Sequence, residues 1–326
     1  MKTKNMLLDD VFRYRRAVVL LSAAEAGLFD YIIERKNVGI SEVSANFNWD
    51  RRGTEILLNA LCGIGYLAKE DNRYHIPEAL KDVFSPEEFP LFKEWFVHEW
   101  RLLNRWVHLP EVLNSGKPYR EAEKKSVHRN HRNFILSMAQ REKENLDAML
   151  SGISLQDHRH LLDLGGGPGL FAIGFAEKYP KLQATVFDSP ETEPLARDFF
   201  RSSPARDRLH FMGGDFLRDD FGNSYDAALL SSILHIYGPE ENAALIKRVY
   251  HSLQPGGKIV IRDFFLNPQK TGPTDGLLFA VNMLVNTERG HAYSTAEMKA
   301  WLRDAGFKKI QKIRLKGKMA LLEAQK

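Results

Sequence analysis

Apolar side chains recur every three to four residues in the first part of the chain, which is the period of an amphipathic helix. Residues 8–34 follow this period, and residues 51–66 follow it again. Between them, residues 39–42 predict the beginning of another helix, with Ser41 as its N-cap. Two strand-like runs at 66–69 and 73–76 flank the turn-forming residues 70–72. Helices followed by a two-stranded wing predict a winged-helix unit.

The pattern changes near residue 160, where short apolar runs begin to alternate with helical segments. Strands are predicted at 161–164, 183–187, 209–212, 225–233 and 258–262, and helices at 169–178, 190–201, 239–253 and 295–305. Residues 307–314 and 318–324 predict a terminal antiparallel hairpin. Alternation of strands and helices with short loops is typical of a doubly wound α/β sheet. We therefore predict a mostly parallel, Rossmann-like domain after the helical winged-helix region.

Length and composition fit a two-domain globular protein. The chain has 326 residues, 44% of them hydrophobic and 27% charged, and a formal net charge of +4, which requires no nucleic-acid or membrane partner. Cys62 is the single cysteine, which excludes an intramolecular disulfide and a cysteine-based zinc site, and we assign no metal site. The N-terminus does not resemble a signal peptide, and no stretch approaches the roughly 20 apolar residues of a membrane span. We expect a cytoplasmic protein.

A winged-helix unit first suggests DNA binding, and the helix at 51–66 would be the one that enters the major groove. Such a helix needs several basic or amide side chains on one face. Residues 51–66 offer only Arg51, Arg52 and Asn59 and are otherwise mostly apolar. The pattern favours a dimerisation or substrate-covering role over binding of nucleic acid.

A glycine-rich turn follows the first strand of the α/β region. Gly165, Gly166, Gly167 and Gly169 surround Pro168, whereas the third glycine of a dinucleotide fingerprint is replaced by Leu170. A pyrophosphate uses free amides at the helix N-terminus, and Pro168 removes one of them. S-adenosylmethionine carries no phosphate, so the turn favours this methyl donor over a nicotinamide dinucleotide.

Acidic residues close the successive strands around this turn. Asp188 ends the second strand, where an acid accepts hydrogen bonds from ribose hydroxyls. Asp215 ends the third strand and is expected to meet the adenine amino group, with Phe216 beside the ring. Asp163 either faces the methionine ammonium or caps the glycine turn. Each acid by itself is also compatible with a local capping role.

Ordered motifs then identify a family resemblance over nearly the whole chain. They are LDLGGGPG (162–169), VFDSP (186–190), GGDF (213–216), LHIYGPEE (234–241), LQPGGKIVI (253–261) and AGF (305–307). In this order they resemble the class I S-adenosylmethionine-dependent O-methyltransferases of the caffeate, hydroxyindole and bacterial polyketide type. The resemblance implies a homodimer formed by a winged-helix domain at 1–115, linking helices at 116–150 that contribute to a substrate pocket, and a donor-binding domain at 151–326.

The resemblance also assigns roles to individual residues. His235 matches the catalytic base, and histidine suits this role because its ordinary pKa of about 6.5 lies near neutral pH. Asp263 matches the acid that orients the histidine, although the family usually has the longer Glu there. A second family acid is replaced by Ala292, with Glu288 or His291 as possible substitutes. The donor site gains Ser231 and the aromatic Tyr237, and the substrate-facing positions are Phe134, Met138, Met283 and Asn286.

The leading hypothesis is transfer of a methyl group to a hydroxyl of a small aromatic or polycyclic metabolite by direct displacement. Two alternatives stay open. The same donor site could serve transfer to carbon or nitrogen, or a reaction that uses the donor without methyl transfer, because the set of acids is incomplete at Ala292. A winged-helix regulator that senses S-adenosylmethionine is the alternative from another class of protein.

Overall fold

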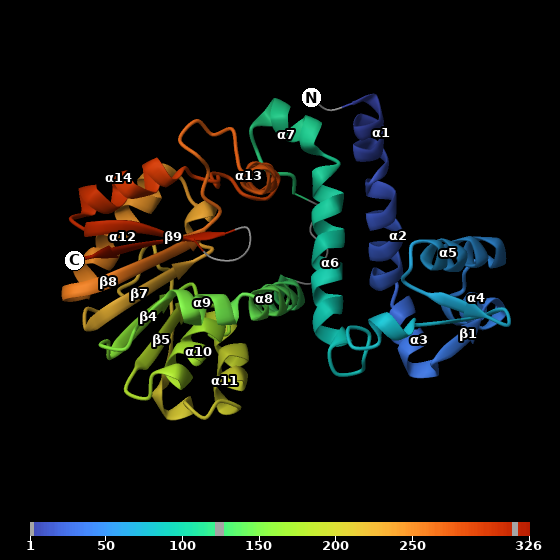
Figure 1. The fold of residues 1–326 in the computed structure, drawn as a ribbon, viewed down its shortest axis with the longest axis horizontal. Helices are drawn as coiled ribbons and strands as arrows, with labels where there is room; N and C mark the ends of the chain where they lie inside the picture. The colour runs from blue at the N-terminus through green and yellow to red at the C-terminus, as the bar shows by residue number, and fades with distance from the viewer. Residues whose placement is uncertain (1–2, 121–126, 315–318) are drawn as a thin grey trace. The chain divides into compact units, whose positions relative to one another are not determined.

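A computed structural model describes residues 3–120, 127–314 and 319–326. The side chains of residues 91, 127–131, 133, 134, 137 and 314 lie outside the description as well. The chain divides into two units, residues 1–104 and 105–326, which are described separately (Figure 1).

The first unit is mostly helical. Its helices are α1 (Lys4–Phe12), α2 (Tyr14–Glu25), α3 (Leu28–Arg35), α4 (Ile40–Phe47), α5 (Arg51–Gly63), the short 3-10 helix η1 (Glu78–Leu80), and most of α6 (Phe89–Trp106). Strands β1 (Asn37–Gly39), β2 (Ala68–Glu70) and β3 (Arg73–His75) form an antiparallel sheet in the order β1-β3-β2. One apolar core, with Leu28, Phe29, Leu58 and Tyr74 among its buried members, packs these elements together.

Three details of this unit differ from the sequence prediction. Residues 8–34 form parts of three helices rather than one, and Gly27 between α2 and α3 has a left-handed φ of +80°. Ser41 is not an N-cap, because α4 begins at Ile40 and the Gly39 N–H donates to Glu42 at 2.9 Å. Strand β1 was not predicted. Its three residues join the predicted hairpin as a third strand.

The second unit carries the α/β sheet. Its helices are α7 (Leu109–Ser115), α8 (Val127–Lys143), α9 (Leu146–Gly152), α10 (Leu170–Lys178), α11 (Glu193–Arg201), α12 (Pro239–Ser252), α13 (Thr274–Asn286) and α14 (Thr295–Ala305), and its 3-10 helices are η2 (Pro190–Thr192), η3 (Arg206–Arg208) and η4 (Leu234–Ile236). Its strands are β4 (His160–Leu164), β5 (Gln183–Asp188), β6 (Leu209–Gly213), β7 (Tyr225–Ser231), β8 (Leu253–Asp263), β9 (Lys308–Arg314) and β10 (Ala320–Gln325).

The seven strands lie in the order β6-β5-β4-β7-β8-β10-β9. The five strands from β6 to β8 are parallel, and β10 pairs antiparallel with both β8 and β9. Parallel strands are covered on both faces, which explains their nearly continuous apolar runs. The α/β fold class, its mostly parallel sheet and the helical N-terminal region are thereby confirmed.

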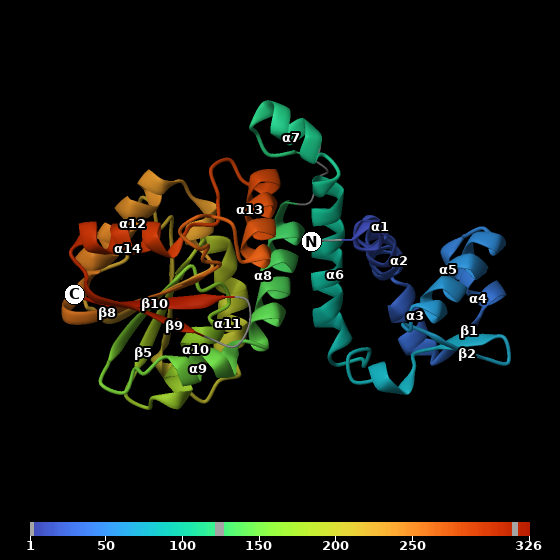
Figure 2. The ribbon, with the colours of Figure 1, turned by 45° about the horizontal axis from the view of Figure 1, so that its top comes forward.

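Helices cover the two faces of the sheet (Figures 1 and 2). One core contains buried residues of α12 and α14, and the other contains buried residues of α9, α10 and α11. Strand order reverses at β4, whose neighbours are β5 on one side and β7 on the other. Ligands of open α/β sheets bind beyond the carboxyl ends of the strands at such a point. In the described part of the chain, no helix combines the length and apolarity that crossing a membrane requires.

Candidate active site

The glycine turn connects β4 to α10 at the point where strand order reverses. Gly165, Gly167 and Gly169 have φ values of +69°, +57° and +83°, a region that L side chains rarely adopt. A Cβ atom on Gly165 would lie 2.6 Å from Ile233 Cδ1, and one on Gly169 would lie 2.6 Å from Phe200 Cε1. Glycine is therefore required by conformation and by space, and the turn brings its backbone to the carboxyl edge of the sheet.

Asp163 is a buried carboxyl group directly before this turn. It has no exposed surface, and neither side-chain oxygen has a hydrogen-bond partner within the described chain. Burial raises its pKa to about 7; the backbone of Ala172 lowers that pKa, and the charge of Asp188 raises it. The carboxyl packs against the glycine turn, since a Cβ atom on Gly166 would lie 2.5 Å from Asp163 Oδ2. Both the ammonium-facing role and the turn-capping role of Asp163 stay predictions. An uncompensated buried carboxyl group fits a ligand that brings a positive charge.

Four residues predicted for the donor site come together around one open cavity of about 510 Å³. Asp188, Asp215, Phe216 and Tyr237 line it. The rings of Phe216 and Tyr237 meet edge to face with their centroids 5.7 Å apart. These residues follow the ends of β5, β6 and β7, so the cavity lies at the strand ends where the sequence predicted the donor site.

Both cavity acids also accept backbone hydrogen bonds. Asp188 accepts from the N–H groups of Gly167 at 2.8 Å and Ser189 at 2.7 Å, so it holds the glycine turn in place. Asp215 accepts from the Leu217 N–H at 2.9 Å. A carboxylate offers about four acceptor positions, so these contacts leave capacity for a ligand. Their binding roles stay predictions.

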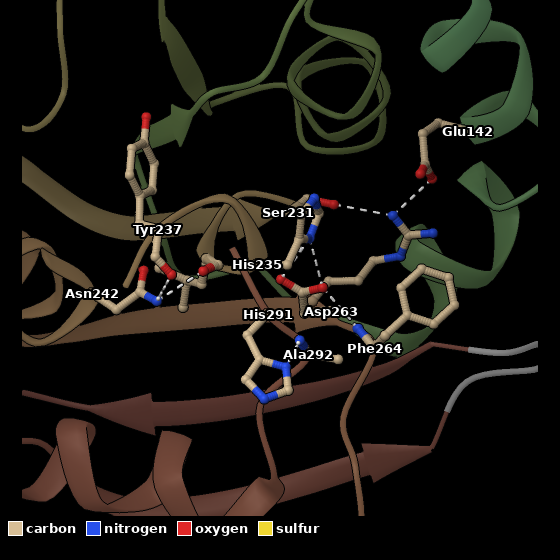
Figure 3. Close-up of polar contacts among 11 residues, drawn as sticks. Glu142, Ser231, His235, Tyr237, Asn242, Asp263, Phe264, His291 and Ala292 are labelled. Carbon is tan, nitrogen blue, oxygen red and sulfur yellow. Dashed lines mark hydrogen bonds and ion pairs between the residues drawn. The ribbon is translucent and has the colours of Figure 1, made fainter. Parts of the chain in front are cut away.

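Tyr237 is held by its backbone. Its carbonyl oxygen accepts a hydrogen bond from Asn242 Nδ2 at 3.2 Å (Figure 3). It also accepts one from the Tyr293 hydroxyl. Asn242 Nδ2 also donates to the Leu234 carbonyl at 2.8 Å, so one buried side chain fixes both ends of η4. Burial raises the pKa of the Tyr237 phenol to about 12, with a further contribution from nearby carboxylates. The phenol therefore stays protonated at neutral pH.

His235 and Asp263 form a buried pair. His235 lies in η4 after β7, Asp263 ends β8, and the side chains point toward one another (Figure 3). His235 Nδ1 lies 2.9 Å from Asp263 Oδ1 and 3.1 Å from Oδ2. Asp263 Oδ1 also accepts a hydrogen bond from the Phe264 N–H at 2.8 Å. The Phe279 ring lies perpendicular to the imidazole, with the ring centroids 4.7 Å apart. The carboxylate of Asp263 thus reaches the histidine despite being shorter than Glu.

Neither suggested substitute for the second family acid points to His235. Ala292 is itself buried, and its N–H donates to the adjacent His291 Nδ1 at 2.8 Å, so that the His291 ring turns back on its own backbone (Figure 3). Burial lowers the pKa of His291. Glu288 forms an exposed ion pair with Arg120. The described residues therefore pair His235 with a single acid.

The four predicted substrate-facing residues are distributed over α8 and α13. Met138 is partly buried on α8, and Met283 is buried on α13. Asn286 Oδ1 accepts from Arg105 Nη1 at 2.7 Å, and Asn286 Nδ2 donates to the Asn282 carbonyl at 2.7 Å. The side chain of Phe134 lies outside the described residues. Contact of these positions with a substrate stays a prediction, and the Asn286 amide is engaged by other protein groups.

One buried group at the site was missed by the sequence interpretation. Arg262 precedes Asp263 on β8 and has 1% of its surface exposed. Its Nη1 lies 2.7 Å from Glu142 Oε2 of α8 and donates to Ser231 Oγ at 3.1 Å. Ser231 ends β7, two residues before the predicted end of that strand, and its hydroxyl accepts a hydrogen bond from this guanidinium. The sequence did contain a signal for this group, because Arg262 directly follows the apolar run of residues 259–261 within one predicted strand.

Comparison with known proteins agrees with this geometry. The solved structure titled "PigF with SAH" shares the fold over 100% of both chains, with a TM-score of 0.89 and 24% identity. The chain belongs to the O-methyltransferase domain family, whose model matches residues 110–308. It is thus an enzyme of that family, and the predicted dependence on S-adenosylmethionine is confirmed at this level.

Two relatives illustrate the range of the family. The chain is 27% identical to the tetracenomycin polyketide synthesis 8-O-methyl transferase TcmO of Streptomyces glaucescens, over 91% of this chain and 89% of that protein. It is also 27% identical to the L-tyrosine C(3)-methyltransferase of Streptomyces lavendulae, over 88% of this chain and 82% of that protein.

The site residues fit an S-adenosyl donor. The glycine turn leaves no room for side chains at Gly165 and Gly169, and the buried oxygens of Asp163 lack a partner. The cavity beside the turn carries the carboxylates of Asp188 and Asp215 together with two aromatic rings. These groups offer acceptors for hydroxyl and amino hydrogens and apolar surface for a base.

Proposed function

We propose that the enzyme methylates a hydroxyl group of a small aromatic or polycyclic metabolite, with His235 as general base. The observation that carries this proposal is the buried contact of 2.9 Å between His235 Nδ1 and Asp263. When Nδ1–H donates to the carboxylate, the neutral imidazole presents its Nε2 lone pair as an acceptor. The pair is therefore prepared to remove a proton.

The reaction combines proton removal with displacement at carbon. The bound donor supplies an electrophilic methyl group on a sulfonium, and S-adenosylhomocysteine is the leaving group. His235 Nε2 takes the hydroxyl proton as the acceptor oxygen forms its bond to the methyl carbon. Asp263 stabilises the resulting imidazolium through its two contacts with Nδ1. Positioning of the acceptor next to the methyl group supplies the rest of the rate enhancement.

Substitution of the pair tests this assignment. With a phenol that the wild type methylates, we expect His235→Gln to lower kcat by about 10²- to 10⁴-fold, the usual contribution of a general base. Affinity for S-adenosylhomocysteine, measured by calorimetry, should change little. His291→Gln is the matched control, because that ring bonds to its own backbone. Full turnover by His235→Gln would show that proximity alone suffices and that His235 is not the base.

Transfer to carbon is a second candidate, favoured by two observations. Ala292 removes the second acid, and one relative is named as a C(3)-methyltransferase of L-tyrosine. A donor with a ¹³C-labelled methyl group distinguishes the outcomes, because methoxy, aryl-methyl and N-methyl carbons have different chemical shifts in the product. We expect a methoxy signal, and an aryl-methyl signal would replace the O-transfer proposal by C-transfer.

A homodimer formed through residues 1–115 is part of the proposal. It is supported by exposed apolar side chains on α1, where Leu7, Val11 and Phe12 expose 56%, 60% and 45% of their surface. Exposed apolar groups that gather on one helix are typical of an interface. Light scattering should give a dimer for the wild type and a monomer for Leu7→Glu/Val11→Glu.

A DNA mobility-shift assay tests the alternative of a winged-helix regulator. We expect no shift of DNA fragments by the protein, and a shift would favour the regulator over the enzyme.

A further inference from the structure

We propose that Arg262 is the receptor for the carboxylate of the donor's amino-acid end, with Asp163 receiving the ammonium of the same end. This inference rests on the donor site proposed above, but it is independent of His235 and of the acceptor.

The first observation is the environment of the guanidinium. Arg262 is the largest fully buried side chain of the described chain. Its Nη1 serves both Glu142 and Ser231, and the ring of Phe171 lies 5.5 Å from its Cζ, whereas the buried Nε–H has no partner. A guanidinium has five N–H donors in a planar fork that matches a carboxylate. The unpartnered Nε–H thus lies on a part of the fork that Glu142 does not occupy.

The second observation is the position of Arg262 relative to Asp163. Strand pairing aligns Asp163 with Leu229 on β7, Leu229 with Val260 on β8, and Ser231 with Arg262. Since side chains alternate along a strand, Asp163, Ser231 and Arg262 share one face of the sheet. This is the face covered by α10, because Leu229 and Val260 belong to the core that contains residues of α10.

One buried carboxyl group and one buried guanidinium therefore lie at the ends of the two strands that flank β7. Strands β4 and β8 are separated by β7 and hence by about 10 Å. Asp163 has two oxygens without a partner, and Arg262 has one N–H without a partner. An α-amino acid carries an ammonium and a carboxylate on one carbon, so it can satisfy both groups at once. Adenosine and its thioether carry neither charge.

Residues Arg262 and Asp263 then serve different parts of the reaction. Successive side chains of a strand point to opposite faces, so Asp263 turns toward His235 while Arg262 turns toward α10 and α8. Strand β8 would place the donor's amino-acid end on one face and the proton-accepting pair on the other. Arg262 is in this scheme a binding residue, and Glu142 and Ser231 are its protein partners.

A purely structural role makes a different prediction. If Arg262 only ties α8 to the sheet through Glu142, then breaking the pair from either side should weaken all ligands alike. If Arg262 binds the carboxylate, only ligands that carry the amino-acid end should respond to its loss. Loss of Glu142 should then leave that affinity in place, because Arg262 remains and has one fewer competing anion.

The experiment measures calorimetric affinities of the full chain for S-adenosylhomocysteine and for 5′-methylthioadenosine, which lacks the amino-acid end. We expect Arg262→Gln to weaken S-adenosylhomocysteine at least roughly 30-fold, because it removes one partner of a buried charge pair. Affinity for 5′-methylthioadenosine should change less than about threefold, and Glu142→Gln should weaken neither ligand. Lys258→Met is the matched control, since it breaks another ion pair on β8, with Glu323 at 3.1 Å.

The double variant Arg262→Gln/Glu142→Gln keeps the test valid if the single variant does not fold, because it removes both buried charges. It should show the same selective loss of S-adenosylhomocysteine. Equal losses for both ligands, or no loss for either, would overturn the role of Arg262 while leaving the donor site intact. Failure of the wild type to bind either ligand would instead refute the donor site and this inference with it.

Discussion

The buried carboxyl group of Asp163 makes folding stability depend on pH in a way that one substitution can expose. Its pKa is about 7 in the folded protein, against an ordinary value of 3.8. Between these two pH values the folded state binds a proton that the unfolded state has released. Stability from this group is therefore fully present below about pH 3.8 and is lost as the pH rises to about 7.

The size of this effect follows from the shift. One pKa unit corresponds to about 1.4 kcal/mol, so a rise from 3.8 to about 7 corresponds to about 4 kcal/mol. Asp163→Asn removes the titration. The free energy of unfolding of the variant, relative to the wild type, should grow by about 1.4 kcal/mol per pH unit up to about pH 7 and then stay constant.

Urea unfolding of the ligand-free protein at several pH values between 5 and 8.5 measures this difference. The slope is the informative quantity, because an Asn in the same place adds only an offset that does not depend on pH. Calorimetry provides a second readout. At pH 6, binding of S-adenosylhomocysteine should release up to about one proton from the wild type and none from Asp163→Asn. This release is measured as a dependence of the binding enthalpy on the ionisation enthalpy of the buffer, which the variant should lack. Parallel stability curves for the two proteins would refute the assignment.

Three further predictions concern the scaffold of the site. Gly169→Ala combines a left-handed φ with a Cβ 2.6 Å from Phe200, so the melting temperature of this variant should fall well below that of the control Gly256→Ala. The φ of Gly256 is also positive, but nothing in the described chain surrounds the place of its Cβ. Equal losses of melting temperature would contradict the steric argument. Tyr293→Phe removes the hydrogen bond to the Tyr237 carbonyl and should cost about 1 kcal/mol in urea unfolding, whereas an unchanged stability would mean that this bond contributes nothing. Asp263→Asn should lower kcat without weakening S-adenosylhomocysteine, because the carboxylate contacts His235, and a selective loss of binding would contradict its role beside the base.

Much of the α/β half could be predicted because local patterns are sufficient there. Buried parallel strands are apolar throughout, so the runs at 161–164 and 258–262 identify β4 and β8. The glycines of the turn predict its positive φ values, which the structure shows. The position of Asp188 about twenty residues after the turn, at the end of the next strand, is what singled it out in the sequence. Residues at the ends of parallel strands meet at one edge, and for this reason the cavity collects acids that are distant in sequence.

The remaining features depend on partners that no local pattern encodes. Glu142 reaches Arg262 only because α8 packs beside the strand ends, and 120 residues separate the two. Asn286 is engaged by Arg105, which precedes it by 181 positions. His291 bonds to its own neighbour rather than to the site, a choice of side-chain rotamer that spacing alone does not fix. The boundaries between α1, α2 and α3 were not predicted, because the helical spacing of apolar residues continues across them.

The place of β10 bears on how the enzyme is made. Ribosomes release a chain in sequence order, and early segments start to fold before later ones emerge. Here β9 is synthesised before β10 but lies outside it, so β9 cannot join the sheet until residues 320–325 have paired with β8. Ala320 pairs with Asp263 itself. The edge of β8 that carries Asp263 is therefore completed late in biosynthesis. Nascent chains stalled before β10 would leave β8 exposed as an open edge, a template for pairing with other chains.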